Sequence, residues 1–255
     1  FPDAIESAYE TNGIEEKIGE VTIQNNKLCF DMASYRPKTF AVRLKKGNVK
    51  AAPIKNIPLQ LPFNSKAFTP ENFGYTVSFD KKGNSFAAEL IGDKVTCDNI
   101  TFSIADHENK NVIKCKGDTI QLPKEAAGKK LYILAASTDK DRKSTFLVNG
   151  KSHEFEIPYY SGFYGQWGHK GVSDGYIRNA SLAYIGSHRH TEKGNDTYIY
   201  TYMYKLGIEL PQEAHTLVLP KDENIAVFAI TLSDNYIDDI STANEMRTLP
   251  LEVSK

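Results

Sequence analysis

The chain has 255 residues, with 31 basic and 32 acidic side chains and a formal net charge of −1. This balance gives no electrostatic basis for binding nucleic acid or an anionic membrane surface, and we expect neither partner. No apolar run approaches the roughly 20 residues that a membrane-spanning helix needs. Cys29, Cys97 and Cys115 lie in no CxxC or Cys/His zinc spacing, and we interpret most of them as small buried apolar residues.

Strand patterns recur along the chain and helical periodicity is scarce, so the sequence predicts an all-β fold. Fourteen Tyr and thirteen Phe favour the same fold, because aromatic side chains suit pleated surfaces. The clearest expected strands are Lys27–Met32, Thr39–Leu44, Val95–Phe102, Leu131–Ala136, Ser144–Val148, Thr216–Leu219 and Ala226–Leu232. Short strands separated by turn signals are typical of a β-sandwich or jelly roll.

The composition changes around residues 45–59, where charges, a glycine and prolines gather. Segments of this kind suit extended linkers, and we place a linker at 46–58. The β pattern in 1–45 is too short to bury a core alone, so we interpret it as the last strands of a sandwich that begins upstream. Residues 59–240 are long enough for a complete β-sandwich, and 241–255 form a C-terminal tail.

Alternate positions along Tyr198–Tyr204 carry tyrosine, which places four rings on one face of a strand. Ile199 and Met203 occupy the opposite face, with Thr201 between them. A strand with aromatic residues on one side and apolar residues on the other is expected to be covered on both faces. The pattern therefore predicts an inner strand.

His188 and His190 project from one face of their own strand, a spacing that metal sites use. A metal site needs a third ligand, and His169 and Asp196 are the nearest candidates in the sequence. The alternative is a structural pair of histidines, hydrogen-bonded to backbone or tyrosine hydroxyl groups at one end of a sheet.

The segment 159–169, YYSGFYGQWGH, is an aromatic run interrupted by glycines. Sugars are commonly held by an aromatic ring against their C–H face and by amide or carboxylate groups that bond their hydroxyls. The candidate carbohydrate contacts are Tyr160, Gln166, Trp167, His188 and His190. The alternatives are that the rings of this segment close one end of the sandwich core or contact another domain.

The turn at 79–86, FDKKGNSF, offers oxygen ligands around a glycine, as calcium-binding loops do. Asp80, Asn84 and Glu89 are the candidate calcium ligands. The turn lacks the dense acidic series of an EF-hand loop, which favours a plain turn. No G-x-S-x-G, H-E-x-x-H, Walker or dinucleotide-binding motif occurs, and we nominate no catalytic residue.

Several segments, in order, resemble the C-terminal region of bacterial α-mannosidases of glycoside hydrolase family 38. They are Ser7–Gly13, Lys38–Leu44, Leu61–Asn64, Phe79–Phe86, Ile120–Pro123, Leu134–Ser137, Gly165–Trp167 and Ser187–His190. The resemblance covers nearly the whole chain. It implies that 1–45 are the closing strands of a β-sandwich that follows the catalytic domain, and that 59–240 form a galactose-binding-like jelly-roll β-sandwich.

Members of that family are zinc-dependent retaining α-mannosidases, whose zinc ligands and aspartate nucleophile belong to an N-terminal α/β domain. No segment of this chain resembles that domain, so the resemblance implies a chain that is inactive alone, with the family's zinc held elsewhere. Calcium stays a candidate cofactor of this chain, through Asp80, Asn84 and Glu89. The resemblance also implies an accessory role, packing against the catalytic domain of the same polypeptide and able to contact a mannose-containing glycan, in a periplasmic or secreted enzyme. Two alternatives stay open: an autonomous carbohydrate-binding module, and a purely structural or adhesive β-sandwich.

Overall fold

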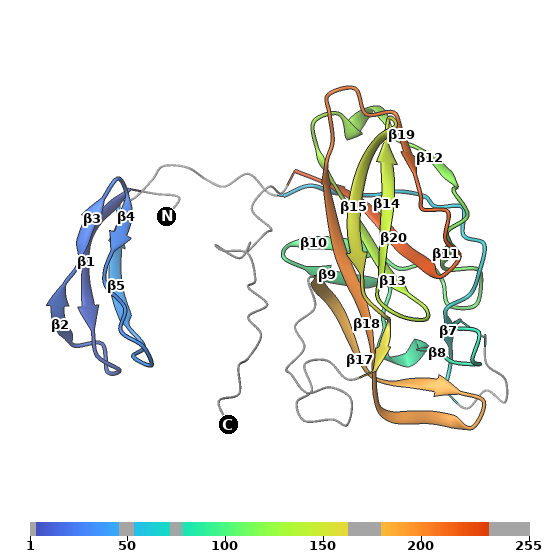
Figure 1. The fold of residues 1–255 in the computed structure, drawn as a ribbon, viewed down its shortest axis with the longest axis horizontal. Coiled ribbons are helices and arrows are strands. Elements are labelled where there is room, and N and C mark those ends of the chain that lie inside the picture. Colours follow the sequence, from blue (N-terminus) through green and yellow to red (C-terminus); the bar gives the residue numbers. More distant parts are fainter. Residues whose placement is uncertain (1–3, 46–53, 72–76, 78, 163–179, 235–255) are drawn as a thin grey trace, which may run out of the picture. The chain divides into compact units, whose positions relative to one another are not determined.

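The computed structural model describes residues 4–45, 54–71, 77, 79–162 and 180–234. These residues form strands and two short 3₁₀ helices, η1 (Ala88–Leu90) and η2 (Lys124–Ala126), so the predicted all-β fold is confirmed. The chain divides into two compact units, Phe1–Pro53 and Ile54–Lys255 (Figure 1). No helix in the described part of the chain is long and apolar enough to cross a membrane.

The first unit has little buried surface in its described part. A three-stranded antiparallel sheet in the order β2–β1–β5 accompanies a separate hairpin, β3–β4. The strands are β1 (Ile5–Thr11), β2 (Lys17–Glu20), β3 (Thr22–Gln24), β4 (Lys27–Cys29) and β5 (Thr39–Leu44). Among residues 4–45 only Ala8 and Thr11 are buried, whereas Ile18, Met32 and Tyr35 are exposed. The described residues of this unit therefore enclose no hydrophobic core.

The second unit packs a four-stranded sheet against a nine-stranded sheet, counted over the described residues, which confirms the predicted β-sandwich. The smaller sheet, in the order β12–β19–β14–β15, contains β12 (Thr119–Gln121), β14 (Arg142–Val148), β15 (Lys151–Ile157) and β19 (Thr216–Val218). The larger sheet has the order β11–β20–β13–β18–β17–β8–β7, with β16 beside β18 and β6 beside β20. Its strands are β6 (Asn56–Pro58), β7 (Phe68–Thr69), β8 (Ser85–Ala87), β11 (Ile113–Lys114), β13 (Lys130–Ser137), β16 (Ser161–Gly162), β17 (Ser181–Thr191), β18 (Gly194–Glu209) and β20 (Ile225–Ser233).

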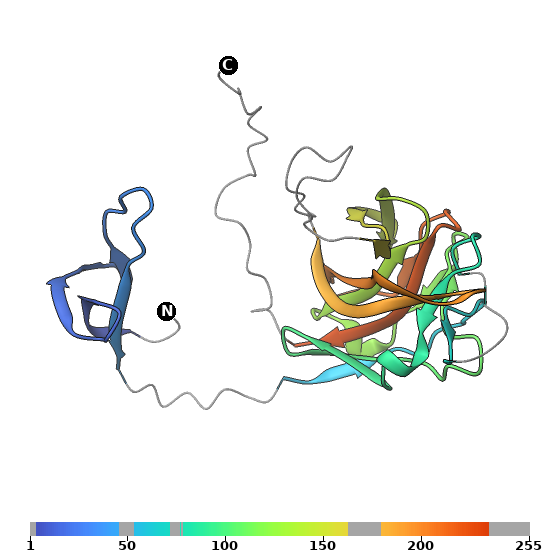
Figure 2. The same ribbon diagram turned by 90° about the horizontal axis from the view of Figure 1, so that it is seen from below.

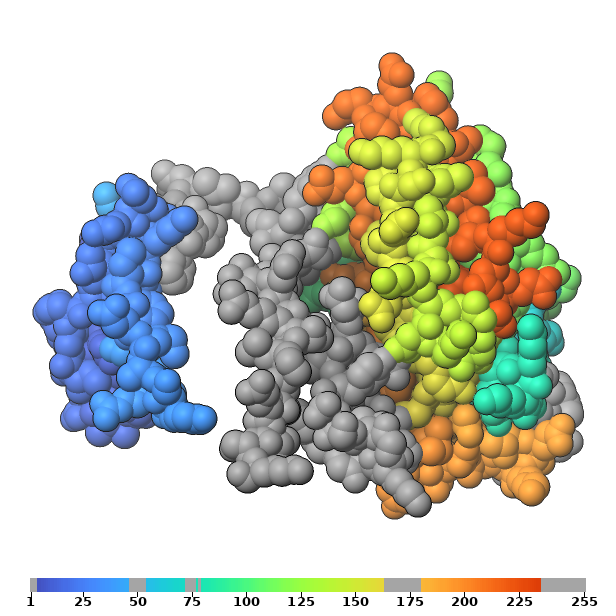
Figure 3. All heavy atoms as spheres, in the orientation of Figure 1, coloured from blue at the N-terminus to red at the C-terminus, as the bar shows by residue number. Residues whose placement is uncertain are grey.

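Strand β13 is buried along its whole length because it separates two hydrophobic cores. Leu131 and Ile133 enter a core shared with the four-stranded sheet, whose strands β14 and β15 cover the face seen in Figure 3. Tyr132 and Leu134 enter a second core on the opposite face. A separate hairpin, β9 (Lys94–Cys97) and β10 (Ile100–Ser103), supplies side chains to the second core. Alternation along one strand thus serves both cores.

A bulge in β20 adapts this strand to the second core. The pairing of β13 with β20 shifts by one residue beside Leu134 and Ala135, which leaves Phe228 as an extra residue. Phe228 and its neighbour Ala229 consequently both enter the second core. The ring of Phe228 lies 5.3 Å from that of Phe86, edge to face. The bulge thereby brings an additional aromatic side chain against strand β8.

Strands β17 and β18 form a long hairpin that curves across the unit (Figure 2). Tyr200, Tyr202 and Tyr204 form a row with 6.4 and 6.3 Å between neighbouring ring centroids, and Tyr202 and Tyr204 are buried, as predicted for an inner strand. The prediction is wrong for Tyr198, which is 75% exposed. Its φ of 66° falls where the register of the hairpin shifts, and the turned backbone takes this side chain out of the row.

Pairs of residues with positive φ form three of the hairpin turns: Asn25–Asn26, Asp98–Asn99 and Asn149–Gly150. Two-residue turns of this kind match the twist of antiparallel strands, and Asn, Asp and Gly tolerate the conformation best. The single strand expected at Val95–Phe102 is for this reason a hairpin, β9–β10, that turns at Asp98–Asn99.

Cys29, Cys97 and Cys115 form no disulfide with one another. Cys115 is buried as the sequence indicated, Cys97 is partly buried, and Cys29 is exposed, contrary to the interpretation of most cysteines as core residues. Burial raises the pKa of the Cys115 thiol far above its usual range, which leaves it protonated and unreactive.

We expect the Gly150→Ala variant to be about 1 kcal/mol less stable, because its φ of +83° is unfavourable for a residue with a Cβ. Gly92→Ala is the matched control, since both added methyl groups would meet open space and Gly92 has no positive φ. Urea unfolding of the two variants measures the difference. Equal stabilities would show that the conformation of the β14–β15 turn does not matter.

Candidate functional site

Two imidazole side chains lie together on strand β17, next to the short strand β8. His190 is paired with Ser85 of β8, and His188 lies two positions earlier on the same face of β17. The two rings stack with centroids 5.5 Å apart and 29° between their planes. The predicted shared face of the two histidines is therefore present.

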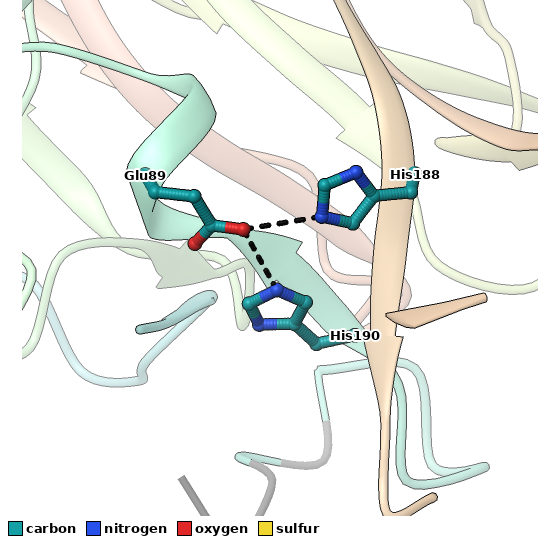
Figure 4. Close-up of side chains that lie close together, drawn as sticks. All are labelled: Glu89, His188 and His190. Carbon is teal, nitrogen blue, oxygen red and sulfur yellow. Dashed lines mark hydrogen bonds and ion pairs between the residues drawn. The ribbon is translucent and has the colours of Figure 1, made fainter. Parts of the chain in front are cut away.

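A carboxylate completes a three-residue cluster, Glu89–His188–His190 (Figure 4). Glu89 belongs to η1, directly after β8, and its Oε1 lies 3.1 Å from His188 Nε2 and 3.0 Å from His190 Nε2. The three possible ligand atoms all lie within 4.8 Å of one another. Among the described residues this is the one group of three or more His, Cys, Asp or Glu side chains arranged so closely.

The remaining nitrogen of each imidazole also has a polar neighbour. Thr69 Oγ1 lies 2.9 Å from His190 Nδ1 and 2.5 Å from Ser85 Oγ, and all three residues are buried. Ser187 Oγ lies 3.3 Å from His188 Nδ1 on the more exposed side. These contacts fix the orientation of the rings and point both Nε2 atoms at Glu89.

The third member of this cluster differs from the candidates nearest in the sequence. Asp196 pairs with Arg189, with an Nη2 to Oδ2 distance of 2.7 Å, and His169 lies outside the described residues. Glu89, which the sequence suggested for calcium, is 99 residues from His188 and 101 from His190. The one sequence feature that could have indicated Glu89 is its position just after the short strand β8. Local patterns do not predict that β8 pairs with β17, so they could not place Glu89 beside the histidines.

A cavity of about 1010 Å³ opens beside the cluster, with Thr69 and Glu89 in its wall. Phe68, Ala88, Ile91 and Ile104 give it apolar surface, and Lys66, Asp93, Asp106, His107 and Glu108 give it charged or polar edges. Glu89 has 30% of its side chain exposed, so its carboxylate is accessible from this side.

Two buried hydroxyl groups lie close to Gly186, which is two positions before His188 on β17. A Cβ at Gly186 would be 2.5 Å from Thr201 Oγ1 and 2.8 Å from Tyr184 Oη, and neither buried hydroxyl makes a hydrogen bond of normal geometry. Burial, assisted by the negative charge of Glu89, raises the pKa of Tyr184 to about 12. The absence of a side chain at Gly186 leaves room for these two groups.

Asp80 and Asn84 form a separate buried network. The Asp80 carboxylate accepts hydrogen bonds from the backbone N–H of Lys82 (2.9 Å), from the backbone N–H and side-chain amide of Asn84 (3.1 and 2.7 Å), and from the Tyr160 hydroxyl (2.8 Å). These protein donors use the oxygens that a calcium ion would need. Glu89 points to the histidines, so the structure does not group the three calcium candidates.

The five candidate carbohydrate contacts also separate. Tyr160 is fully buried, with its ring 5.0 Å from Phe79 and 5.2 Å from Phe86, so it is a core residue and presents no surface to a sugar. Gln166 and Trp167 lie outside the described residues. Of the remaining pair, His190 is 5% exposed, and both histidines contact Glu89.

The two packed sheets and the enclosed core define a β-sandwich domain. The chain belongs to the AziU2-like beta-sandwich domain family, and the match covers residues 55–236. This membership agrees with the sandwich predicted for 59–240, and it names no mannosidase. No curated protein matches the chain significantly.

Tyr160→Phe is expected to lower the free energy of unfolding by about 1.5 kcal/mol or more, because it removes a hydrogen bond to the buried Asp80 carboxylate. Tyr198→Phe is the matched control at an exposed position and is expected to change stability by less than about 0.5 kcal/mol. Urea unfolding tests both.

Added calcium should leave the urea midpoint of the wild-type chain unchanged, because protein donors already bond the Asp80 carboxylate. A rise of the midpoint with calcium that Asp80→Asn abolishes would contradict the interpretation of this network as metal-free.

Lys114 gives a pH dependence that can be checked. Its ammonium lies 4.1 Å from the ring centroid of Phe79, and burial lowers its pKa from 10.5 to about 8, opposed in part by the charge of Asp80. Between these values the unfolded chain binds a proton that the folded chain lacks, so stability rises with pH. We expect the Lys114→Met variant to lack this rise when its free energy of unfolding is measured in urea between pH 8 and 10.5. Parallel stability–pH profiles for the wild type and the variant would contradict the prediction.

Proposed function

We propose that this chain is the non-catalytic C-terminal β region of a zinc-dependent retaining α-mannosidase. The ordered resemblance from Ser7–Gly13 to Ser187–His190 supports the proposal, and membership of a β-sandwich family is compatible with it. In this role the chain packs against the catalytic domain of the same polypeptide and does not hydrolyse mannosides alone. Periplasmic or secreted localisation follows from the same proposal.

The scarcity of buried side chains among residues 4–45 is the observation that supports it. Ala8 and Thr11 are the buried residues of 4–45, while Ile14, Ile18 and Met32 are 75%, 61% and 66% exposed. A segment of this size with so little buried apolar surface lacks the stabilisation that offsets the entropy of folding. Additional strands of the same polypeptide would supply the missing cover and complete a second sandwich.

Glycan contact is the second part of the proposal. Tyr160 is buried and does not contribute, so contact with a mannose-containing glycan would depend on other surface groups. Isothermal titration with α-linked manno-oligosaccharides separates this accessory role from an autonomous carbohydrate-binding module, which would bind them without the catalytic domain. A purely structural or adhesive sandwich would bind none in either form.

The test compares the 255-residue chain with the full polypeptide that carries the upstream α/β domain. We expect the full polypeptide to hydrolyse an aryl α-mannoside and the chain alone to be inactive. Amide hydrogen exchange should be fast in β1, β2 and β5 of the chain alone and slow in the full polypeptide, whereas β13 and β20 should be protected in both. Strong protection of β1 and β5 in a monomeric isolated chain would overturn the proposal.

Matched substitutions locate the contact. Ile18→Ser should weaken association with the separately expressed upstream part about tenfold or more, since it removes an apolar side chain that is 61% exposed on β2. Ile185→Ser, at a similarly exposed position of β17, should not. Equal effects of the two substitutions would show that the sheet of the first unit is not the docking surface.

A further inference from the structure

We propose that Glu89, His188 and His190 bind a divalent transition-metal ion of the zinc class. The proposal concerns residues of the β-sandwich alone and does not rest on the mannosidase assignment. It starts from the convergence of two imidazole Nε2 atoms on one carboxylate oxygen, at 3.1 and 3.0 Å (Figure 4).

The distances fit a metal site. Ligand atoms that lie 2.0–2.1 Å from a tetrahedral zinc ion are about 3.3 Å apart, and the two Glu89 to histidine separations need only small outward movements to reach this value. Both histidines come from a hydrogen-bonded strand, and Glu89 comes from η1 immediately after the strand paired with it. The backbone therefore holds both imidazoles beside the carboxylate, with all three possible ligand atoms within 4.8 Å of one another.

The type of ligand selects the type of metal. Two imidazole nitrogens and one carboxylate oxygen suit zinc and similar first-row ions, while calcium and magnesium prefer oxygen ligands throughout. Three protein ligands leave a fourth tetrahedral position for water or another ligand. Because Glu89 lies in the wall of the 1010 Å³ cavity, that position is accessible from the solvent side.

The surroundings of the histidines provide an independent argument. Metal-bound histidines usually donate their second ring N–H to an oxygen, which fixes the tautomer and the ring orientation. His190 Nδ1 has the buried Thr69 hydroxyl at 2.9 Å, and Thr69 in turn contacts Ser85. His188 Nδ1 has Ser187 Oγ at 3.3 Å. Both rings can thus donate through Nδ1 and keep Nε2 for a metal ion.

The competing arrangement is a metal-free cluster in which both Nε2–H groups donate to Glu89. The two arrangements require different tautomers and differ in their response to metal. A bound ion would link η1 to β17 and reinforce the pairing of β8 with β17, which consists of only two residue pairs. Metal binding should therefore stabilise the folded unit, whereas a metal-free cluster gains nothing from added zinc.

Isothermal titration of the full, untagged chain with zinc tests the site, with circular dichroism to confirm folding of each variant. We expect one equivalent to bind at micromolar or lower concentration and to raise the melting temperature. Cobalt should give the visible absorption of a tetrahedral ion. Glu89→Gln and His188→Asn should each weaken zinc binding at least tenfold. The control His153→Asn, which changes a histidine on β15 outside the cluster, should leave zinc binding unchanged.

Thr69→Val is a positioning variant of nearly equal shape that removes the hydroxyl beside His190. We expect it to weaken zinc binding about 10–100-fold while the chain stays folded. Absence of zinc binding to the folded wild-type chain would overturn the proposal in favour of the metal-free cluster. Binding that Glu89→Gln and His188→Asn leave unchanged would also overturn it, because the ion would then lie elsewhere.

Discussion

The second unit depends on a single strand that is apolar on both sides. All eight residues of β13 are buried, because one face lies on the core beneath the four-stranded sheet and the other on the core beneath hairpin β9–β10. Every backbone group of such a strand needs a partner. Strand β20 pairs with all of β13 along one edge; along the other, β18 pairs with Lys130–Ala135 and the backbone of Pro158 and Tyr160 bonds Ser137. The positions of the remaining strands follow from this three-strand centre.

The second core connects that centre to the candidate site. Phe86 of β8 packs against Phe228 of β20 and against Tyr160, whose hydroxyl donates to Asp80. These contacts hold β8 at the edge of β17, and η1 begins at the next residue after β8. The carboxylate of Glu89 thus reaches the histidines because aromatic packing has already fixed the backbone on which it stands.

Local patterns predicted those features that one strand determines alone. The run Leu131–Ala136 predicted a strand, and the spacing of His188 and His190 predicted their common face. The place of Glu89 depends on pairing between distant segments, and the hydrogen bonding of the Asp80 carboxylate depends on donors that include the distant Tyr160. The exposure of Tyr198 depends on a register shift in the hairpin. Such long-range features leave no periodic trace in the sequence.

The order of the strands also has a consequence for how the protein forms. Strand β20, the last in the described chain, lies between β13 and β11 and also pairs with β6, so contacts that join residues near 57 and near 231 complete the sheet. Chains with contacts this distant fold slowly, because a long loop must close before the contacts can stabilise it. During synthesis, the apolar edge of β13 has no partner on this side until residue 233 has left the ribosome. Until β20 is available to pair with it, β13 is therefore an apolar strand with one unpaired edge, which is the kind of segment that aggregates readily.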